Sequence, residues 1–331
     1  MSNTAALDNA NEQIHALSWP LSRYCFDWTV TTPIKFPEYA GSAIRGAFGK
    51  ALRKTACMTH LPECKSCPLF HSCPYTAIFE TPAPLEHTLQ KFTQIPAPYV
   101  IEAPEWGRHE YLLGETLSFN IVLMGQAQYH FALIIFALQR AFQFDVSHGT
   151  AQLDCVKICL PNGDKSVIFS KELKQIQNHS QTFSLAKPLD KHSDCTIEFL
   201  TPLRLQENGR GLSPQRINAQ NFIMTLARRL SLVMEFHTGQ NLNLPFQEMK
   251  QYLTEVEIEK DLHWQDWVRY SSRQHQKMHL GGVVGHLTFF NLHPLFINLL
   301  SIAQWTHVGK NASFGLGRFQ IEGEKPLMLE G

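Results

Sequence analysis

The sequence predicts an α+β fold built from two ferredoxin-like domains in tandem. The order strand, helix, strand, strand, helix, strand occurs once in each half of the chain. Alternating apolar residues indicate the strands, and apolar residues at helical spacing indicate the helices. At 331 residues the chain is long enough for two domains that each bury a core. Four clustered cysteines after the first helix predict a small metal-binding insertion.

The first half supplies one full set of these elements. A strand rich in β-branched and aromatic residues is followed by a helix, two short strands, a second helix and a closing strand. Their predicted ranges are 23–36, 39–56, 99–104, 115–125, 127–142 and 151–160. We therefore expect a mobile tail over 1–18 and a domain over 19–160, with the cysteine-rich insertion at 57–80.

The second half repeats the order after a polar segment, 161–193, that we interpret as a hairpin and linker. The predicted elements are a strand, a helix, a pair of strands, a helix and a last strand, which together form a domain over 194–325. Their ranges are 194–205, 218–236, 267–280, 282–290, 294–308 and 314–323.

Composition limits the classes of function. The formal net charge is zero, so any nucleic-acid site must be a local patch rather than a property of the whole surface. The first residues lack the basic start and apolar core of a signal peptide, and no run approaches the eighteen apolar residues of a membrane span. We expect a cytoplasmic protein without a membrane partner.

The stretch HVGKNASFGLGRF, residues 307–319, predicts a site for an anion. Its glycines let backbone amides approach a ligand, while Lys310 and Arg318 favour a phosphate. The glycine spacing matches neither the phosphate loop of nucleotide hydrolases nor a dinucleotide-binding turn. A plain glycine-rich turn before a terminal strand is the alternative.

The cysteine cluster has the composition of a metal site. Thiolates within such a short span suit tetrahedral zinc, which stabilises small loops that have little core of their own. An iron–sulfur cluster is the main alternative, and buried free thiols are the other; His60 or His71 could replace one cysteine. The predicted ligands are Cys57, Cys64, Cys67 and Cys73.

Four stretches resemble a known family. AGSAIRGAFGKALRKTAC, CKSCPLFHSCPYTAIFETP, RYSSRQHQKMHLGGVVGHLTF and HVGKNASFGLGRF occur here in the order seen in CRISPR-associated repeat-RNA (pre-crRNA) processing endoribonucleases of the RAMP superfamily, in the branch with a Cys-rich insertion. The resemblance implies tandem RRM-like domains and a glycine-rich loop that contacts RNA. It implies CRISPR repeat RNA as partner, and other CRISPR-associated proteins of an effector complex as further partners.

Basic and aromatic residues of the second half suit RNA as the ligand. Cations alternating along one strand face would attract a polyanion, and nearby aromatic rings would stack on bases. The predicted RNA-binding residues are Arg269, Tyr270, Gly309, Asn311, Ser313, Phe314, Gly315, Gly317 and Arg318.

The resemblance also implies a chemistry without a catalytic metal. In the family, the 2′-hydroxyl attacks the adjacent phosphate and leaves a 2′,3′-cyclic phosphate and a 5′-hydroxyl. Many relatives keep a catalytic histidine near the first-domain helix, but this helix contains none. We expect His307 to replace it as acid or base, with Lys310 or Arg273 stabilising charge. The alternative function is a non-cleaving RNA-binding RAMP subunit.

Overall fold

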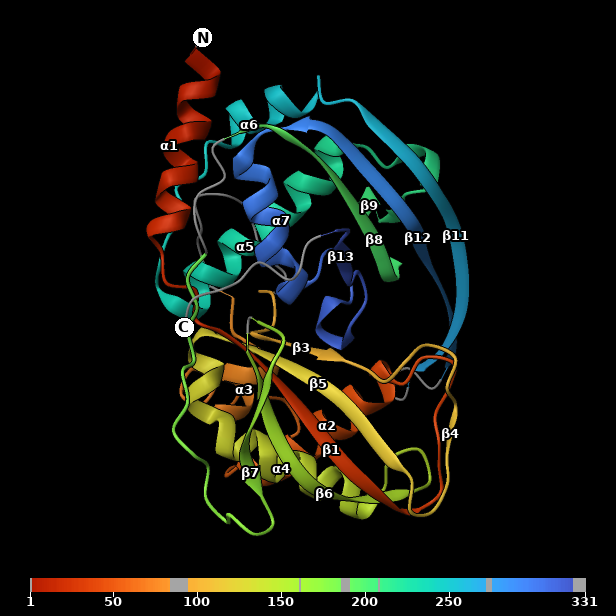
Figure 1. Ribbon diagram of the computed structural model, residues 1–331. Coiled ribbons are helices and arrows are strands. Elements are labelled where there is room, and N and C mark those ends of the chain that lie inside the picture. The colour runs from red at the N-terminus through yellow and green to blue at the C-terminus, as the bar shows by residue number, and fades with distance from the viewer. Residues whose placement is uncertain are drawn as a thin grey trace.

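The computed structural model describes residues 2–83, 95–160, 162–185, 191–207, 209–271 and 276–323, with side chains left out at 2–3 and 269–279. Two α+β halves lie one above the other, as Figure 1 shows, with the N-terminal half below. Each half has one large antiparallel sheet with helices covering one face, and a separate two-stranded sheet, β2–β4 in the first half and β9–β10 in the second. The predicted tandem of ferredoxin-like domains is confirmed.

The N-terminal sheet has the strand order β3-β5-β1-β6-β7. The fourth, first, third and second strands of the repeat thus lie side by side, and β7 adds an edge strand. The elements are β1 (Leu21–Thr32), β2 (Ile34–Lys35), α2 (Gly41–Ala56), α3 (Pro74–Phe79), β3 (Tyr99–Glu102), β4 (Glu110–Tyr111), β5 (Thr116–Met124), η1 (Gly125–His130), α4 (Phe131–Phe144), β6 (Thr150–Cys159) and β7 (Lys165–Ser170).

Alternation along β1 separates two faces of this sheet. Tyr24, Phe26 and Trp28 are buried against α2 and α4, where they form the first core. Arg23 and Asp27 point to the opposite face because strand side chains alternate. That open face is the one that meets the second half of the chain, since Leu21 and Val122 pack into the second core.

The C-terminal sheet repeats the arrangement with the order β11-β12-β8-β13. Its elements are β8 (Ser193–Leu203), β9 (Gln206–Glu207), β10 (Arg210–Gly211), η2 (Pro214–Arg216), α5 (Ala219–Thr238), α6 (Phe246–Leu253), β11 (Ile258–Ser271), β12 (Gln276–Leu292), α7 (Pro294–Thr306), η3 (Ala312–Phe314) and β13 (Phe319–Ile321). The long β11–β12 hairpin bends down beside the N-terminal half (Figure 1).

Two sequence-based predictions about the elements were wrong. Residues 267–280 are not one strand, because β11 ends at Ser271 and β12 begins at Gln276. The predicted mobile tail instead contains helix α1 (Ser2–Ala16), in which Leu7 and Ile14 are buried against the C-terminal half. Apolar residues seven apart lie on one side of a helix, so Leu7 and Ile14 give α1 one apolar side that packs against the C-terminal half.

Candidate functional site

The glycine-rich loop lies at the junction of the two halves. It leaves α7 at Thr306, turns through η3 and enters β13. His307, Phe314 and Leu316 are buried, whereas Lys310 is exposed. The loop is therefore wedged into the molecule along most of its length, and it presents a short basic segment to solvent.

Close packing of backbone explains two of its glycines. Gly315 has φ +100°, and a Cβ there would collide with the Tyr39 hydroxyl and the Ile101 carbonyl. Gly317 has φ +67°, and its Cβ would collide with the Val308 carbonyl. Both conformations favour glycine. Contact between the two halves thus requires Gly315, and close packing within the loop itself requires Gly317, whether or not RNA is bound.

The amides of these glycines are also occupied. The Gly315 N–H donates to the Ala312 carbonyl at 2.8 Å, and the Gly317 N–H donates to the Pro202 carbonyl at 3.1 Å. Direct RNA binding by the backbones of Gly315 and Gly317 is therefore disfavoured in this conformation. Gly309, Asn311 and Ser313 lie on the partly exposed segment around Lys310, where contact with RNA remains a prediction.

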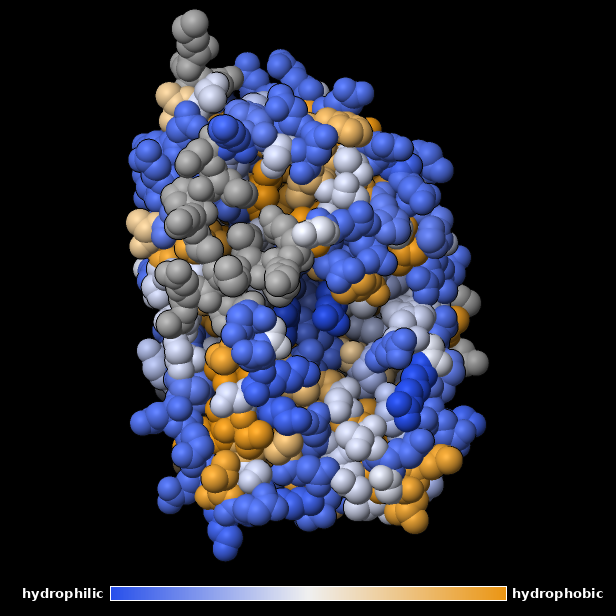
Figure 2. All heavy atoms as spheres, viewed as in Figure 1, coloured by the Kyte–Doolittle hydropathy of each residue, from blue (hydrophilic) through white to orange (hydrophobic). Residues whose placement is uncertain are grey.

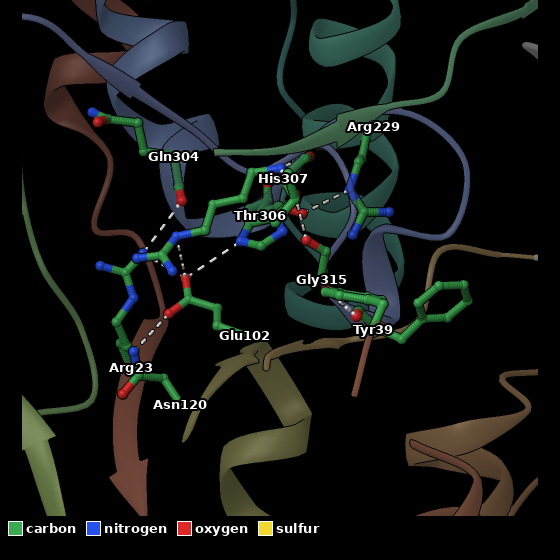
Figure 3. A network of polar contacts seen from close by, with 12 residues as sticks. Arg23, Tyr39, Glu102, Asn120, Arg229, Gln304, Thr306, His307 and Gly315 are labelled. Atoms are coloured by element: carbon green, nitrogen blue, oxygen red, sulfur yellow. Dashed lines mark hydrogen bonds and ion pairs between the residues drawn. The ribbon is translucent and has the colours of Figure 1, made fainter. Parts of the chain in front are cut away.

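Glu102, at the end of β3, is the centre of a buried polar network (Figure 3). Its carboxylate is fully buried and accepts from Arg23 on β1 at 2.9 Å, from His307 at 3.3 Å, and from the Asn120 amide at 3.0 Å. Arg318 approaches Oε1, the oxygen that accepts from Arg23 and His307, at 4.0 Å. One carboxylate thus joins strands of the first half to both ends of the glycine-rich loop.

The charges of this network are fixed by its two arginines. Burial opposes ionisation of Glu102, but Arg23 and Arg318 outweigh it, so the pKa of this carboxyl lies well below its ordinary value of 4.5. Glu102 is therefore ionised at neutral pH. Because two guanidinium groups share one carboxylate, the network keeps a positive charge.

Two arginines also hold the carboxyl end of α7 in place. Arg23 donates to the Gln304 carbonyl at 3.3 Å, and Arg229 donates to the Thr306 carbonyl at 3.0 Å. The last carbonyls of a helix lack partners within the helix and carry partial negative charge, so cations suit them. Burial lowers the pKa of Arg229 to about 10, which still leaves it charged at neutral pH.

His307 has no access to solvent. Its imidazole is fully buried, and Nδ1 has no hydrogen-bond partner among the described residues. Burial lowers the pKa of His307, although its hydrogen bond to Glu102 opposes the shift. A scissile phosphate cannot reach this ring in the present conformation, so the geometry argues against the predicted catalytic role.

The surface near the network is basic and concave. Figure 2 shows strongly hydrophilic atoms in the hollow between the two halves. Arg23 and Arg318 lie at this junction with side chains 20% and 34% exposed, so part of each guanidinium faces solvent. We give the name central cleft to this region together with the adjoining glycine-rich loop, whose exposed cation is Lys310. Its cations can bind phosphate, and the Glu102 network orients two of them.

Some predicted residues lie outside this description. Arg273 falls outside the described residues, and so do the side chains of Arg269 and Tyr270. Arg269 lies on β11, whereas Lys277, which we would place on the same strand from the sequence, lies on β12 opposite Tyr270. Phe314 is buried and packs with Tyr39 and Trp267, so its ring is not available to stack on a base.

The four cysteines of the insertion line one pocket at the end of α2. Their number and type suit zinc. Across the described residues, however, no three His, Cys, Asp or Glu side chains are arranged to hold a metal ion. Arg53 anchors this segment by donating to the carbonyls of Leu61 and Pro62, both at 2.7 Å. The metal site stays a prediction.

Comparison with known proteins finds similar families and structures. Residues 197–319, which include the glycine-rich loop, match the family model of CRISPR-associated endoribonuclease Cas6. The resemblance to CRISPR-associated RAMP proteins is confirmed. A second family model, described as an N-terminal domain, matches residues 18–181. An uncharacterized protein of Archaeoglobus fulgidus is 25% identical over 289 residues, which cover 86% of this chain and 92% of that protein.

Solved structures share the fold at low identity. A Cas6 product complex aligns with a TM-score of 0.54 and 16% identity over 91% of this chain and 98% of that one. Thermus thermophilus Cas6 aligns with a TM-score of 0.50 and 15% identity over 92% of this chain and 99% of that one. In a partial Cas6-RT-Cas1–Cas2 complex, the TM-score is 0.55 and the identity 16%; the match covers 91% of this chain but only 46% of the other.

The sequence analysis missed Arg23 and Glu102. A carboxylate at the end of the apolar strand YVIE and an arginine at the start of RYCF were the available signals, since buried charges usually occur in pairs. Their pairing depends on which strands are adjacent, and the sequence does not state that. As a separate finding, no helix in the described ranges is long and apolar enough to span a bilayer.

Proposed function

We propose that this protein is an endoribonuclease that cleaves CRISPR repeat RNA in precursor transcripts. The 2′-hydroxyl loses its proton and attacks the adjacent phosphate, the bond from phosphorus to O5′ breaks, and O5′ gains a proton. The products are a 2′,3′-cyclic phosphate and a 5′-hydroxyl. No metal takes part in this reaction.

One observation carries the proposal. The segment that matches the Cas6 family model places its glycine-rich loop beside a cleft with three partly or fully exposed cations. Lys310 comes from the loop, Arg318 from its end, and Arg23 from the other half of the molecule. Arg23 and Arg318 meet at Glu102, and Lys310 adds an exposed cation on the same loop, a set that suits the phosphates of an RNA backbone.

The cleft residues take different roles in this proposal. Lys310 is exposed and neutralises the charge that develops on the phosphorane, while Arg23 and Arg318 bind flanking phosphates. Glu102 and His307 are positioning residues, because both are fully buried and contact the arginines and the loop rather than RNA. Arg273 stays a candidate charge stabiliser.

The second candidate function is an RNA-binding RAMP subunit that does not cleave. The burial of His307 favours it, because the described residues of the loop then offer no exposed imidazole as acid or base. The same cations would serve binding alone. Association with other CRISPR proteins is also proposed, and the solved Cas6-RT-Cas1–Cas2 complex supports it.

Incubation of the protein with labelled repeat RNA in EDTA separates the two functions. We expect cleavage under chelation, with a product 3′ end that resists ligation until the cyclic phosphate is opened and the phosphate is removed to leave a 3′-hydroxyl. Lys310→Ala should slow cleavage at saturating RNA, because it removes transition-state charge stabilisation. Tight binding without any cleavage would support the RNA-binding subunit instead.

We also propose that the cysteine pocket holds a structural zinc ion, with an iron–sulfur cluster as the alternative. Four cysteines at one pocket support this proposal. A metal there would stabilise the insertion and would lie outside the cleavage chemistry.

A further inference from the structure

Aromatic side chains are exposed on the helix layer of the N-terminal half. Phe144, the last residue of α4, is 72% exposed, and Phe136 two turns earlier is 50% exposed. Tyr129, just before the helix, is 84% exposed. Large apolar side chains usually bury, so several exposed rings along one helix suggest an interaction surface.

The charges within the two helices of this layer are all positive, and exposed Asp145 follows directly after Phe144. Helices α2 and α4 together contain Arg45, Lys50, Arg53, Lys54 and Arg140, and neither contains an acidic residue. The protein as a whole is neutral, so this layer is a local concentration of positive charge. Within the described part of the chain, Lys50, Lys54 and Arg140 form no ion pair.

The rings and cations alternate in space. The Arg140 guanidinium carbon lies 5.9 Å from the ring centres of both Phe136 and Phe144. The Lys54 ammonium of α2 also lies 6.0 Å from the Phe144 ring centre. Phe136 and Phe144 are eight residues apart, or about 12 Å along the helix axis, which leaves room for a separate base on each ring. We call this surface the α2–α4 face.

We propose that the α2–α4 face binds single-stranded RNA that extends beyond the central cleft. Such RNA needs rings on which bases stack and cations for its phosphates, and this face offers both in alternation. The proposal rests on the proposed function, which supplies a transcript longer than the segment being cut.

An acidic protein segment is less well matched to this face. Protein interfaces bury a contiguous apolar centre, whereas here Arg140 separates the two phenylalanines. RNA tolerates such separation, because each base stacks on its own ring.

The face and the cleft lie on opposite sides of one sheet. Helices α2 and α4 cover the side that Tyr24 and Phe26 face, while Arg23 points to the other side. Figure 1 shows both helices behind the strands. A short RNA held in the cleft cannot also reach the face, but a transcript with a long flank can pass around the sheet edge.

RNA length therefore tests the proposal. The patch variant combines Phe136→Ala, Arg140→Gln and Phe144→Ala. A control variant that also removes two exposed apolar side chains and one cation elsewhere combines Leu112→Ala, Leu113→Ala and Lys250→Gln. Affinity is measured against salt for a minimal repeat, for a repeat with a long single-stranded flank, and for oligouridine.

We expect the patch variant to bind the flanked repeat and oligouridine roughly tenfold more weakly. Its salt slope on these RNAs should fall by about 0.7, for one lost phosphate contact. Binding of the minimal repeat should not change, and the control variant should match the wild type. Unchanged affinity for oligouridine and the flanked repeat, or an equal loss on all three RNAs, would overturn the proposal.

Failure of the proposed function has a different signature. The wild type would then leave the minimal repeat uncut and unbound, whatever the patch variant does with oligouridine. An acidic protein partner is the outcome if the patch variant keeps full RNA affinity yet loses binding to such a protein.

Discussion

The central cleft and the α2–α4 face both carry cations, but the two regions hold them differently. In the cleft, Arg23 and Arg318 converge on the buried carboxylate of Glu102. On the α2–α4 face, Arg140 and Lys54 contact aromatic rings and have no carboxylate partner among the described residues. Arginines held by a buried anion point in fixed directions, whereas cations on an exposed helix adapt to their ligand. The cleft is thus suited to place one phosphate, and the face to hold a strand loosely.

The largest expected effect comes from the anion that orders the cleft. Glu102→Gln leaves two arginines beside a neutral amide in a buried site, so the free energy of unfolding should fall by about 3 kcal/mol. Chemical denaturation measures this change. Asp154→Asn, which breaks an ion pair to Lys171 on partly exposed side chains, is the control and should cost less than about 1 kcal/mol. Equal losses in the two variants would show that the network does not hold the cleft together.

The glycine-rich loop gives the next effect. Gly315→Ala should cost roughly 2 kcal/mol or more, because the new methyl group meets the Tyr39 hydroxyl and φ is +100°. Gly163→Ala is a matched control, since Gly163 has φ +91° and open space around it. Thermal melting of both variants separates the packing cost from the backbone cost. Identical shifts would mean that contact between the halves does not explain the glycine.

The cysteine pocket adjoins the α2–α4 face, because it lies at the end of α2. If a structural metal holds the insertion, a strong chelator or Cys64→Ser with Cys67→Ser should lower the melting temperature. RNA cleavage by the protein that stays folded should persist. Elemental analysis that finds neither zinc nor iron would contradict the metal proposal.

Acid should lower the stability of the folded state at a second contact between the halves, where His237 is buried in its neutral form. Burial lowers the pKa of His237 to about 4, while Nε2 donates to the Pro96 carbonyl at 2.7 Å. The unfolded chain, with a histidine pKa near 6.5, binds the proton more readily. The stabilisation that neutral His237 contributes is therefore fully present above the unfolded pKa of about 6.5 and is lost as the pH falls toward 4. From pH 7 to 5 the loss should be about 2 kcal/mol.

His237→Gln tests this contact, because a glutamine amide can still donate to the Pro96 carbonyl but does not titrate. The variant should show a flatter decline in stability over the same pH range. A decline as steep as that of the wild type would assign the acid sensitivity to other groups.

The smallest effect concerns one exposed cation of the cleft. Lys310→Ala should lower the salt slope of binding to the minimal repeat by about 0.7, the value for one phosphate contact on a single strand. Lys250→Gln on α6 should leave the slope unchanged. This measurement sharpens the comparison, because loss at Lys310 should affect the minimal repeat and loss at Arg140 should not.

Local sequence patterns determined the element types and their repeated order. Side-chain alternation in RYCFDW and helical spacing in AIRGAFGKAL depend on neighbours in the chain, so β1 and α2 lie close to their predicted ranges. The stretch SSRQHQ carries no strong turn signal, so one long strand was predicted where β11 ends at Ser271 and β12 begins at Gln276.

Only the tertiary structure decided what the chemical groups do. His307 has the sequence context of a catalytic histidine, yet the fold buries its imidazole against Glu102, away from solvent. Arg23 and Arg318 are 295 residues apart and meet because the open face of one sheet packs against the loop of the other domain. Burial and pairing of charge arise between segments that are distant in sequence, so local patterns cannot specify them. The sequence by itself determined the two repeated units and their basic loop, and the packing of one unit on the other determined the cleft.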